Sequence, residues 1–206
     1  MSGDELEPAR PFVALEAARP SAALEVLRLD AERMDDFALV HGEANGAGWC
    51  HCVAWWVPTW QGWGERSADD NRAFRQRLCQ RGEYDGYLLY VDGQPAGWCQ
   101  VGPRDRLSKL VTQFELAPAP DTWAVTCFFI APAHRGRGLA AHLLARVIED
   151  VRGRGAGRLE AFPRRAPHGS TLATLDLWNG PEAMFRAAGF DVIRDDPTRP
   201  VLALVL

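Results

Sequence analysis

The sequence is poor in lysine, in tyrosine and in long apolar runs. Among its 23 basic residues only Lys109 is a lysine, and the chain holds three tyrosines. No apolar stretch approaches the roughly 20 residues that a membrane-spanning helix needs, so we expect no membrane partner. Residues 1–7 are acidic and lack the apolar region of a secretory signal, which favours a cytoplasmic protein. The near absence of lysine carries no functional conclusion.

Two nucleotide-binding motifs are also missing. Neither the Gly-x-Gly-x-x-Gly spacing of dinucleotide-binding folds nor a Walker sequence ending in Gly-Lys-Ser/Thr occurs. The 206 residues carry a formal net charge of −4, which argues against a general nucleic-acid binder. With 47% hydrophobic and 24% charged residues, the composition is that of a globular domain and excludes a fibrous or mostly disordered chain.

What the chain does have is a basic segment inside an acidic sequence. Between His134 and Arg165 eight arginines stand against three acidic residues, a local charge of +5. These arginines are Arg135, Arg137, Arg146, Arg152, Arg154, Arg158, Arg164 and Arg165. A basic segment in an acidic chain indicates a local anion site, and a solvated helix face is the alternative.

The order of the expected elements defines the fold class. Residues 1–20, rich in alanine, glutamate and proline, predict a flexible N-terminal extension, and 21–206 predict a single domain. Strands are expected near residues 23–29, 87–91, 96–101, 123–130, 158–162, 191–194 and 201–206. Helices are expected near residues 30–40, 67–82, 139–151 and 181–189. This is a mixed α/β domain, with a central mixed sheet of six to seven strands flanked by about four helices.

The most informative stretch is residues 130–140, where an almost wholly apolar strand ends and an amphipathic helix begins. Gly136 and Gly138 let the backbone approach a ligand closely. The first turn of a helix also presents unpaired N–H groups, at the end where the helix dipole favours an anion. Arg135 and Arg137 alternate with the glycines. Together these residues predict a phosphate-binding turn.

This turn resembles a motif of the GNAT superfamily of acyl-CoA N-acyltransferases, most of them N-acetyltransferases. The family motif, Arg/Gln-x-x-Gly-x-Gly/Ala after a strand, is met by Arg135-Gly136-Arg137-Gly138-Leu139-Ala140. The family also ends a late helix with an aromatic residue, a short run and Gly-Phe, and residues 184–190 fit that pattern. The order of elements from Ala23 to Leu206 is similar as well, so the resemblance covers most of the chain.

The resemblance implies acetyl-CoA as the co-substrate. Backbone N–H groups of the turn would cradle its pyrophosphate, the strand end would pair with its pantetheine arm, and a bulge would splay that strand from 158–162. The residues implied in cofactor binding are Phe128, Phe129, Ile130, Arg135, Gly136, Arg137, Gly138, Leu139 and Ala140. A backbone N–H near Phe128 to Ile130 would polarise the thioester carbonyl. Arg137, Arg164 and Arg165 are candidates to meet the nucleotide phosphates.

An amine acceptor has to lose a proton before it attacks a thioester. Glu160 is the first candidate for the general base, because the resembled family often places a carboxylate in the strand after the cofactor helix; a surface glutamate is the alternative. His168, in the following loop, is the second candidate. The family's usual general acid, a tyrosine in the late helix, is replaced by Phe185, so another group or water would protonate the leaving thiolate.

Five of the eight tryptophans lie within residues 49–63. In the resembled fold this region covers the acceptor side of the cleft. The tryptophans therefore predict either an aromatic pocket, able to hold an apolar group or a cation, or a satellite core under a long loop.

The same loop holds Cys50-His51-Cys52. The other cysteines are Cys79, Cys99 and Cys127, and this odd count fits reduced thiols better than a disulfide scaffold. The loop could bind a metal together with Cys99 or Cys127, or one thiol could form an acyl-enzyme. Cys-x-Cys is shorter than the usual zinc spacing, however, and the resembled family generally transfers directly. We therefore expect no metal.

The prediction from sequence is an N-acetyltransferase that moves the acetyl group of acetyl-CoA directly to a primary amine of a small molecule or peptide. The alternative, suggested by Phe185, is an acyl-CoA-binding sensor or accessory domain that has lost catalysis. A third hypothesis is a zinc-stabilised interaction module built on the cysteines. Neither nucleic acid nor a membrane is an expected partner.

Overall fold

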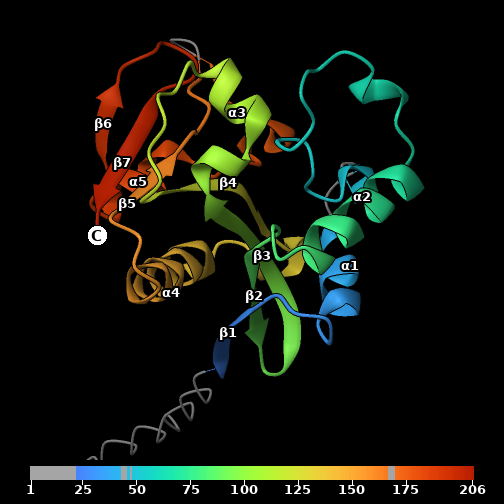
Figure 1. Ribbon diagram of the computed structural model, residues 1–206. Helices are drawn as coiled ribbons and strands as arrows, with labels where there is room; N and C mark the ends of the chain where they lie inside the picture. The colour runs from blue at the N-terminus through green and yellow to red at the C-terminus, as the bar shows by residue number, and fades with distance from the viewer. Residues whose placement is uncertain (1–21, 43–45, 47, 167–169) are drawn as a thin grey trace, which may run out of the picture.

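Seven strands form the central sheet of the computed structural model, which describes residues 22–42, 46, 48–166 and 170–206 (Figure 1). They are β1 Leu24–Arg28, β2 Gly86–Val91, β3 Gln94–Pro103, β4 Thr122–Ile130, β5 Arg158–Ala161, β6 Asp191–Arg194 and β7 Val201–Val205. Their order in the sheet is β1-β2-β3-β4-β5-β7-β6. Among these strands only β4 and β5 run parallel. The mixed sheet is as predicted, and the N-terminal extension expected at 1–20 lies outside the described residues.

The described residues contain five α-helices, one more than the sequence predicted. They are α1 Met34–Gly42, α2 Ala68–Gln80, α3 Ser108–Gln113, α4 Leu139–Gly153 and α5 Glu182–Ala187. The extra helix, α3, lies in the connection between β3 and β4, where the sequence predicted no helix. It has six residues and no side-chain cap, so it carries neither the length nor the start signal that identifies a helix in a sequence. No described helix combines the length and the apolar character that crossing a bilayer requires.

Helices cover both faces of the sheet, and β2 and the middle of β3 are therefore buried on both sides. On one face Leu89 and Val91 pack in a cluster with the apolar stripe of α4 and with Phe185 of α5. On the other face Leu88 packs with α1 and α2. Figure 1 shows α4 on one side of these strands and α1 with α2 on the other. This arrangement explains why the strands read as nearly continuous apolar runs.

Local signals fixed the ends of several elements. Ser67 accepts a hydrogen bond from the Asp70 N–H at 3.1 Å, and Asp70 accepts one from the Ser67 N–H at 3.1 Å, so a capping box starts α2. Asp92 and Gly93 have φ values of 51° and 76°, as a tight hairpin turn between β2 and β3 requires.

An irregularity in β4 opens the sheet in its middle. Cys127 pairs with Gln100 of β3 and Val125 pairs with Val101, which leaves Thr126 as the extra residue of a β-bulge. The bulge expected from the resemblance is therefore at Thr126. It bends the strand and increases its twist.

The parallel pairing of β4 with β5 ends at the same level. It joins residues 122–125 of β4 to residues 158–161 of β5 and goes no further. Beyond it, the half of β4 from Thr126 to Ile130 is hydrogen-bonded to β3 along one edge and turned away from β5 along the other. This free edge is the frame of the candidate site.

Candidate functional site

A short segment of chain lies in the opening between β4 and β5. The Phe128 N–H donates a hydrogen bond of 2.6 Å to the Trp178 carbonyl, and Asn179 Nδ2 donates one of 2.7 Å to the Phe162 carbonyl just after β5. Residues 178–179 therefore bridge the two splayed strands. The Phe128 amide, one of those expected to polarise a thioester, faces this opening and holds a carbonyl oxygen there.

The predicted phosphate-binding turn leaves its backbone donors free. Gly136 and Gly138 have φ values of 72° and 74°, a conformation that L side chains rarely adopt. The first backbone bond of α4 runs from the His142 N–H to the Gly138 carbonyl, at 3.2 Å. Within the described structure the amides of residues 136–141 donate no hydrogen bond. These free donors and the N-terminal end of the helix dipole are features that favour an anion at this turn.

A groove of about 520 Å³ starts at this turn. It is lined by the turn itself, by the first turns of α4 and by α5, including Gly136, Gly138, Ala141, Met184 and Ala187. The side chains here are small and apolar, so the groove can admit a long, narrow ligand whose charged end lies against the turn.

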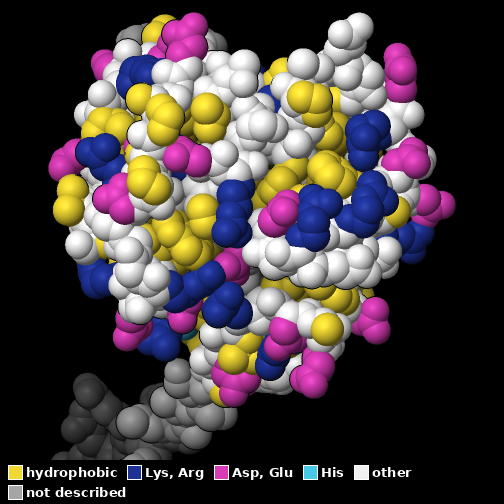
Figure 2. Space-filling view, in the orientation of Figure 1, with side chains coloured by type: hydrophobic (Ala, Val, Ile, Leu, Met, Phe, Trp, Pro, Cys, Tyr) yellow, Lys and Arg dark blue, Asp and Glu magenta, His cyan; other side chains and the backbone are white. Residues whose placement is uncertain are grey.

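Most of the basic segment is neutralised by ion pairs and is not available to a ligand. Arg154 pairs with Asp85, and Arg164 pairs with Asp176. Arg165 is held by the Glu182 carboxylate at 2.9 Å, which raises the pKa of this guanidinium above its ordinary value. Figure 2 shows basic and acidic side chains interspersed over the face it presents. Arg164 and Arg165, two of the candidates for the nucleotide phosphates, are thus occupied.

The two arginines of the turn are different, because neither forms an ion pair with a described carboxylate. Arg135 Nε donates to the Ile130 carbonyl at 2.9 Å, and its guanidinium lies 5.5 Å from the Phe129 ring centroid. Arg137 Nη1 lies 3.2 Å from His134 Nδ1. Both guanidinium groups can therefore pair with an anionic ligand near the mouth of the groove.

A second cavity, of about 690 Å³, continues from this groove. The two share Ile130, Arg135, Ala140 and Pro181. The cavity follows the free edge of β4 past Phe128 and Phe129 and ends against Trp49, Trp55, Trp60, Trp63 and Trp178. The structure thus brings all the predicted cofactor-binding residues except Arg137 to the lining of these two connected spaces.

The tryptophan-lined end combines the two interpretations of the aromatic loop. Trp55 is 1% exposed, stacks on Trp178 with ring centroids 5.6 Å apart and belongs to the core. Trp60 is 44% exposed and forms an outer wall. The Nζ atom of Lys109 lies 3.1 Å from the Trp60 ring centroid, a cation–π contact. Burial lowers the pKa of Lys109 to about 8. A ring face can therefore contact an ammonium group, but burial at this place favours the neutral amine over the ammonium.

A cluster of sulfur and imidazole groups forms another part of the cavity wall. His41 Nε2, Cys50 Sγ and Cys52 Sγ all lie within 4.8 Å of one another. His41 Nε2 is 3.7 Å from Cys50 Sγ, and Cys52 Sγ is 3.2 Å from Cys127 Sγ of β4. The hydrogen bond with Cys52 and burial raise the pKa of Cys50, and burial raises that of Cys52. His41 was not a candidate from the sequence, and its place among the buried residues of α1 is the only signal that could have pointed to it.

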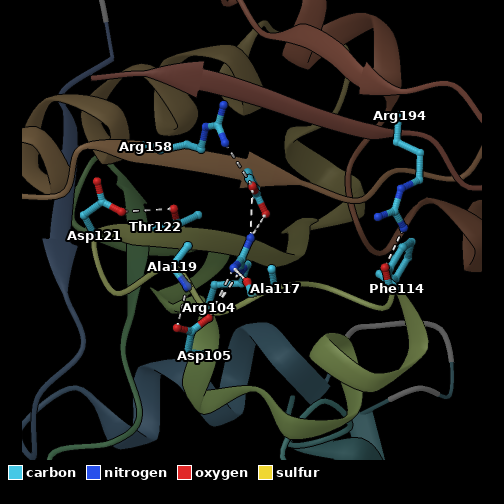
Figure 3. Close-up of polar contacts among 10 residues, drawn as sticks. Arg104, Asp105, Phe114, Ala117, Ala119, Asp121, Thr122, Arg158 and Arg194 are labelled. Atoms are coloured by element: carbon cyan, nitrogen blue, oxygen red, sulfur yellow. Dashed lines mark hydrogen bonds and ion pairs between the residues drawn. The ribbon is translucent and has the colours of Figure 1, made fainter.

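Glu160 lies apart from both spaces, in a buried ion pair. Its side chain is 2% exposed, and its carboxylate oxygens accept hydrogen bonds of 3.0 and 3.2 Å from Arg104 Nη1. Figure 3 shows Arg104 pointing toward this carboxylate, with Asp105 and the Ala117 carbonyl around the same guanidinium. Its role as the general base stays a prediction, and this placement does not favour it. His168, the second candidate, lies outside the described residues.

Phe185 and the three tyrosines lie outside the cavity lining. Phe185 belongs to α5, and its side chain is fully buried in the core. The hydroxyl of Tyr84 donates to the His51 carbonyl at 3.2 Å, that of Tyr90 donates to Asp36 at 2.6 Å, and that of Tyr87 is bonded to Asp150. None of these hydroxyls faces the free edge of β4, so the described cavity offers no tyrosine as a general acid.

Comparison with known proteins agrees with the fold and the turn. The model of the Acetyltransferase (GNAT) family matches residues 49–170. No curated protein sequence matches the chain. An acetyltransferase from Thermus thermophilus has a similar structure, with a TM-score of 0.55 and 18% identity over 89% of this chain and 97% of that chain.

Two further solved structures are similar at lower identity. The ribosomal-protein-S18-alanine N-acetyltransferase from Escherichia coli gives a TM-score of 0.51 and 14% identity, covering 89% of this chain and 94% of that chain. A GNAT family acetyltransferase from Brucella melitensis in complex with acetyl-CoA gives 0.51 and 12%, covering 89% and 88%. These identities show the shared fold, while the family model spans more than half of the chain and includes the glycine turn; the chain belongs to the acetyltransferase (GNAT) family.

Proposed function

We propose that the protein is an acetyl-CoA-dependent N-acetyltransferase that transfers the acetyl group directly to a primary amine held at the tryptophan-lined end of the cavity. The observation that carries the proposal is that the groove and the cavity adjoin. The groove begins at the free amides before α4, and the cavity that shares part of its lining follows the edge of β4 to the tryptophans. A long, phosphate-bearing thioester and an amine can meet there from opposite ends.

Acetyl-CoA fits the residues of the groove. The amides of Gly136 to Ala140 can donate hydrogen bonds to the pyrophosphate, and Arg137 lies beside them with His134, not a carboxylate, as its neighbour in the described structure. The edge of β4 from Thr126 to Ile130 lacks a neighbouring strand, so its backbone can pair with the amides of the pantetheine arm. The Brucella relative was solved with acetyl-CoA, which supports this assignment.

The Phe128 amide is the donor we assign to the thioester carbonyl. In this structure it donates to the Trp178 carbonyl. When acetyl-CoA binds, the thioester carbonyl would replace the Trp178 carbonyl as the acceptor, so residues 178–179 have to move away from β4. An amide that also meets the oxyanion of the tetrahedral intermediate is worth about 2.7–4 kcal/mol in other enzymes. The neutral amine nitrogen attacks the carbonyl carbon, the carbon–sulfur bond breaks, and CoA leaves as the thiolate. The nitrogen is positively charged after the attack, and it releases its proton to water or to the thiolate to give the amide.

The acceptor proton does not require a carboxylate base. Burial against the same tryptophans lowers the pKa of Lys109 from 10.5 to about 8. An acceptor amine that enters this apolar end also loses solvation, which lowers its pKa and favours the neutral form that attacks. Its proton then passes to water, and none of the described residues that line the cavity is an aspartate or glutamate.

Cofactor binding is tested with two matched glycine variants. Gly138 and Gly155 lie beyond opposite ends of α4, have φ values of 74° and 84°, and have nothing within 4 Å of an added Cβ. Gly138→Glu places a negative charge at the phosphate site and should weaken acetyl-CoA binding more than about tenfold in calorimetry. Gly155→Glu carries the same backbone strain and should bind normally. Equal affinities for the two variants would refute the assignment of the turn.

Turnover is tested by release of free CoA from acetyl-CoA across a set of primary amines. Amines that carry an apolar or aromatic group next to the amino group should react fastest, since the acceptor end of the cavity is made of ring faces. Tight binding of acetyl-CoA without CoA release for any amine would leave a cofactor-binding domain and refute the transferase proposal.

A further inference from the structure

The wall of the acceptor cavity contains ligand atoms that meet the requirements of a metal site. His41 Nε2 comes from α1, whereas Cys50 Sγ and Cys52 Sγ come from the loop that follows, and all three lie within 4.8 Å of one another. We propose that this cluster binds one Zn²⁺, with Cys127 of β4 as the fourth ligand. The proposal does not depend on the transferase function.

The distances agree with tetrahedral coordination. With zinc bonds of about 2.3 Å to sulfur and 2.0–2.1 Å to nitrogen, tetrahedral geometry sets sulfur–nitrogen distances near 3.6 Å and sulfur–sulfur distances near 3.8 Å. His41 Nε2 and Cys50 Sγ are 3.7 Å apart. Cys127 Sγ lies 3.2 Å from Cys52 Sγ but is not part of the group that is mutually within 4.8 Å, so its side chain has to rotate to reach the ion.

The chemistry of the set selects zinc. Two or three thiolates with one imidazole form a soft donor set, and no described aspartate or glutamate belongs to the cluster. His41 and Cys52 are both 4% exposed, so the ion would be held mostly away from water. Such a site differs from the oxygen-rich ones that select Mg²⁺ or Ca²⁺.

The backbone explains how so short a spacing can work. His51 and Cys52 have φ values of 45° and 49°, a left-handed conformation at two consecutive residues that are not glycine. This turn brings the Cys50 and Cys52 sulfurs together on one side of the loop while the His51 ring lies outside the cluster. Backbone strain of this kind destabilises the loop, and bound metal would offset it.

Zinc at this place would join three elements of the acceptor wall. It would tie α1, through His41, and the loop, through Cys50 and Cys52, to the bulged strand β4, through Cys127. The tryptophans of residues 49–63 extend from the same loop. The ion would therefore fix the acceptor end of the cavity without touching the phosphate turn.

The test uses the full chain, fully reduced and freed of metal, titrated with Zn²⁺ against a chromophoric chelator and with Co²⁺ by absorbance. We expect one ion per chain, the visible bands of tetrahedral Co²⁺ and a thiolate-to-cobalt band in the near ultraviolet. Cys50→Ser and His41→Asn should each raise the Zn²⁺ dissociation constant more than about 100-fold, beyond the effect of losing a second-shell partner. Cys127→Ser should reduce the thiolate-to-cobalt band.

Cys79→Ser is the matched control, because Cys79 is a half-buried free cysteine on α2 outside the cluster. It should keep wild-type affinity and spectrum. Zinc should raise the melting temperature of the wild type and of Cys79→Ser but not that of Cys50→Ser, which distinguishes lost binding from misfolding. No binding by the reduced protein would overturn the proposal. So would octahedral Co²⁺ bands, or an equal loss of affinity in Cys50→Ser and Cys79→Ser.

Discussion

Replacing Glu160 with glutamine removes the negative charge from the buried ion pair with Arg104 while keeping the size of the side chain. Both carboxylate oxygens accept from Arg104 Nη1, and the two side chains are 2% and 5% exposed. Arg104 also contacts Asp105 Oδ1 at 3.3 Å, but that carboxylate is 36% exposed. After the substitution the Arg104 guanidinium keeps the partly exposed Asp105 carboxylate, the Ala117 carbonyl and the new glutamine amide oxygen as its acceptors.

Breaking a buried pair by removing one partner costs about 3–5 kcal/mol. Because Asp105 remains beside Arg104 and the glutamine oxygen can still accept one bond, we expect the lower end, about 3 kcal/mol. For a chain of this size each kcal/mol lowers the melting temperature by about 2–4 °C, so the expected fall is about 6–12 °C. Arg104→Met combined with Glu160→Leu removes both charges, and we expect it to recover most of the loss.

Denaturant unfolding of the wild type, Arg104→Met, Glu160→Leu and the double variant gives the coupling free energy of the pair. Release of CoA gives the turnover of the wild type and of Glu160→Gln at a temperature where both are folded. Glu160→Gln should keep turnover within a few-fold of the wild type, because the carboxylate does not reach the cavity. Loss of a true general base costs about 10²–10⁴-fold. A Glu160→Gln variant with unchanged stability and a 100-fold loss of turnover would refute this reasoning and restore Glu160 as the base.

Three further perturbations test other parts of the fold. Ser67→Ala removes one half of the capping box and should cost about 1 kcal/mol in denaturant unfolding, whereas an unchanged midpoint would contradict the cap. Lys109 releases its proton near pH 8 when folded and near 10.5 when unfolded, so the unfolded chain binds more protons between these values and stability rises with pH across that window. Lys109→Met should therefore melt higher than the wild type at pH 7, with the difference shrinking toward pH 10; a constant difference would argue against a buried ammonium. Acetyl-CoA should speed hydrogen exchange in residues 176–181 if the Trp178 carbonyl leaves the Phe128 amide, and increased protection there would contradict the exchange of acceptors.

The parts of the fold that the sequence predicted are those with local causes. The apolar run of β4 and the stripe of α4 each arise from contacts within a few residues or from a simple period. The glycine turn before α4 belongs with them, because its shape is set by the backbone conformation of Gly136 and Gly138 and by the start of a helix. Binding of phosphate at this turn stays a prediction.

The parts that it did not predict depend on pairs far apart in the chain. Glu160 meets Arg104 across 56 positions, and Cys52 meets Cys127 across 75. No period or spacing records such pairs, so a carboxylate in the expected strand read as a base rather than as half of an ion pair. The contact of Trp178 with Phe128 is of the same kind, since it exists only because β4 and β5 separate beyond residue 125.

The division of the cavity between backbone and side chains has a consequence for the acceptor. The proposed cofactor end is built largely from backbone amides and small residues, which would recognise what all acyl-CoA molecules share. The other end is built from tryptophan rings, and no described carboxylate lines it, so an ammonium there would meet ring faces and no counter-charge. Ring faces stabilise a cation by about 0.5–2 kcal/mol, less than desolvation costs it, as the lowered pKa of Lys109 against Trp60 illustrates. Acceptor affinity should therefore come from the apolar part of the molecule, depend little on salt, and increase as pH rises and the amine becomes neutral.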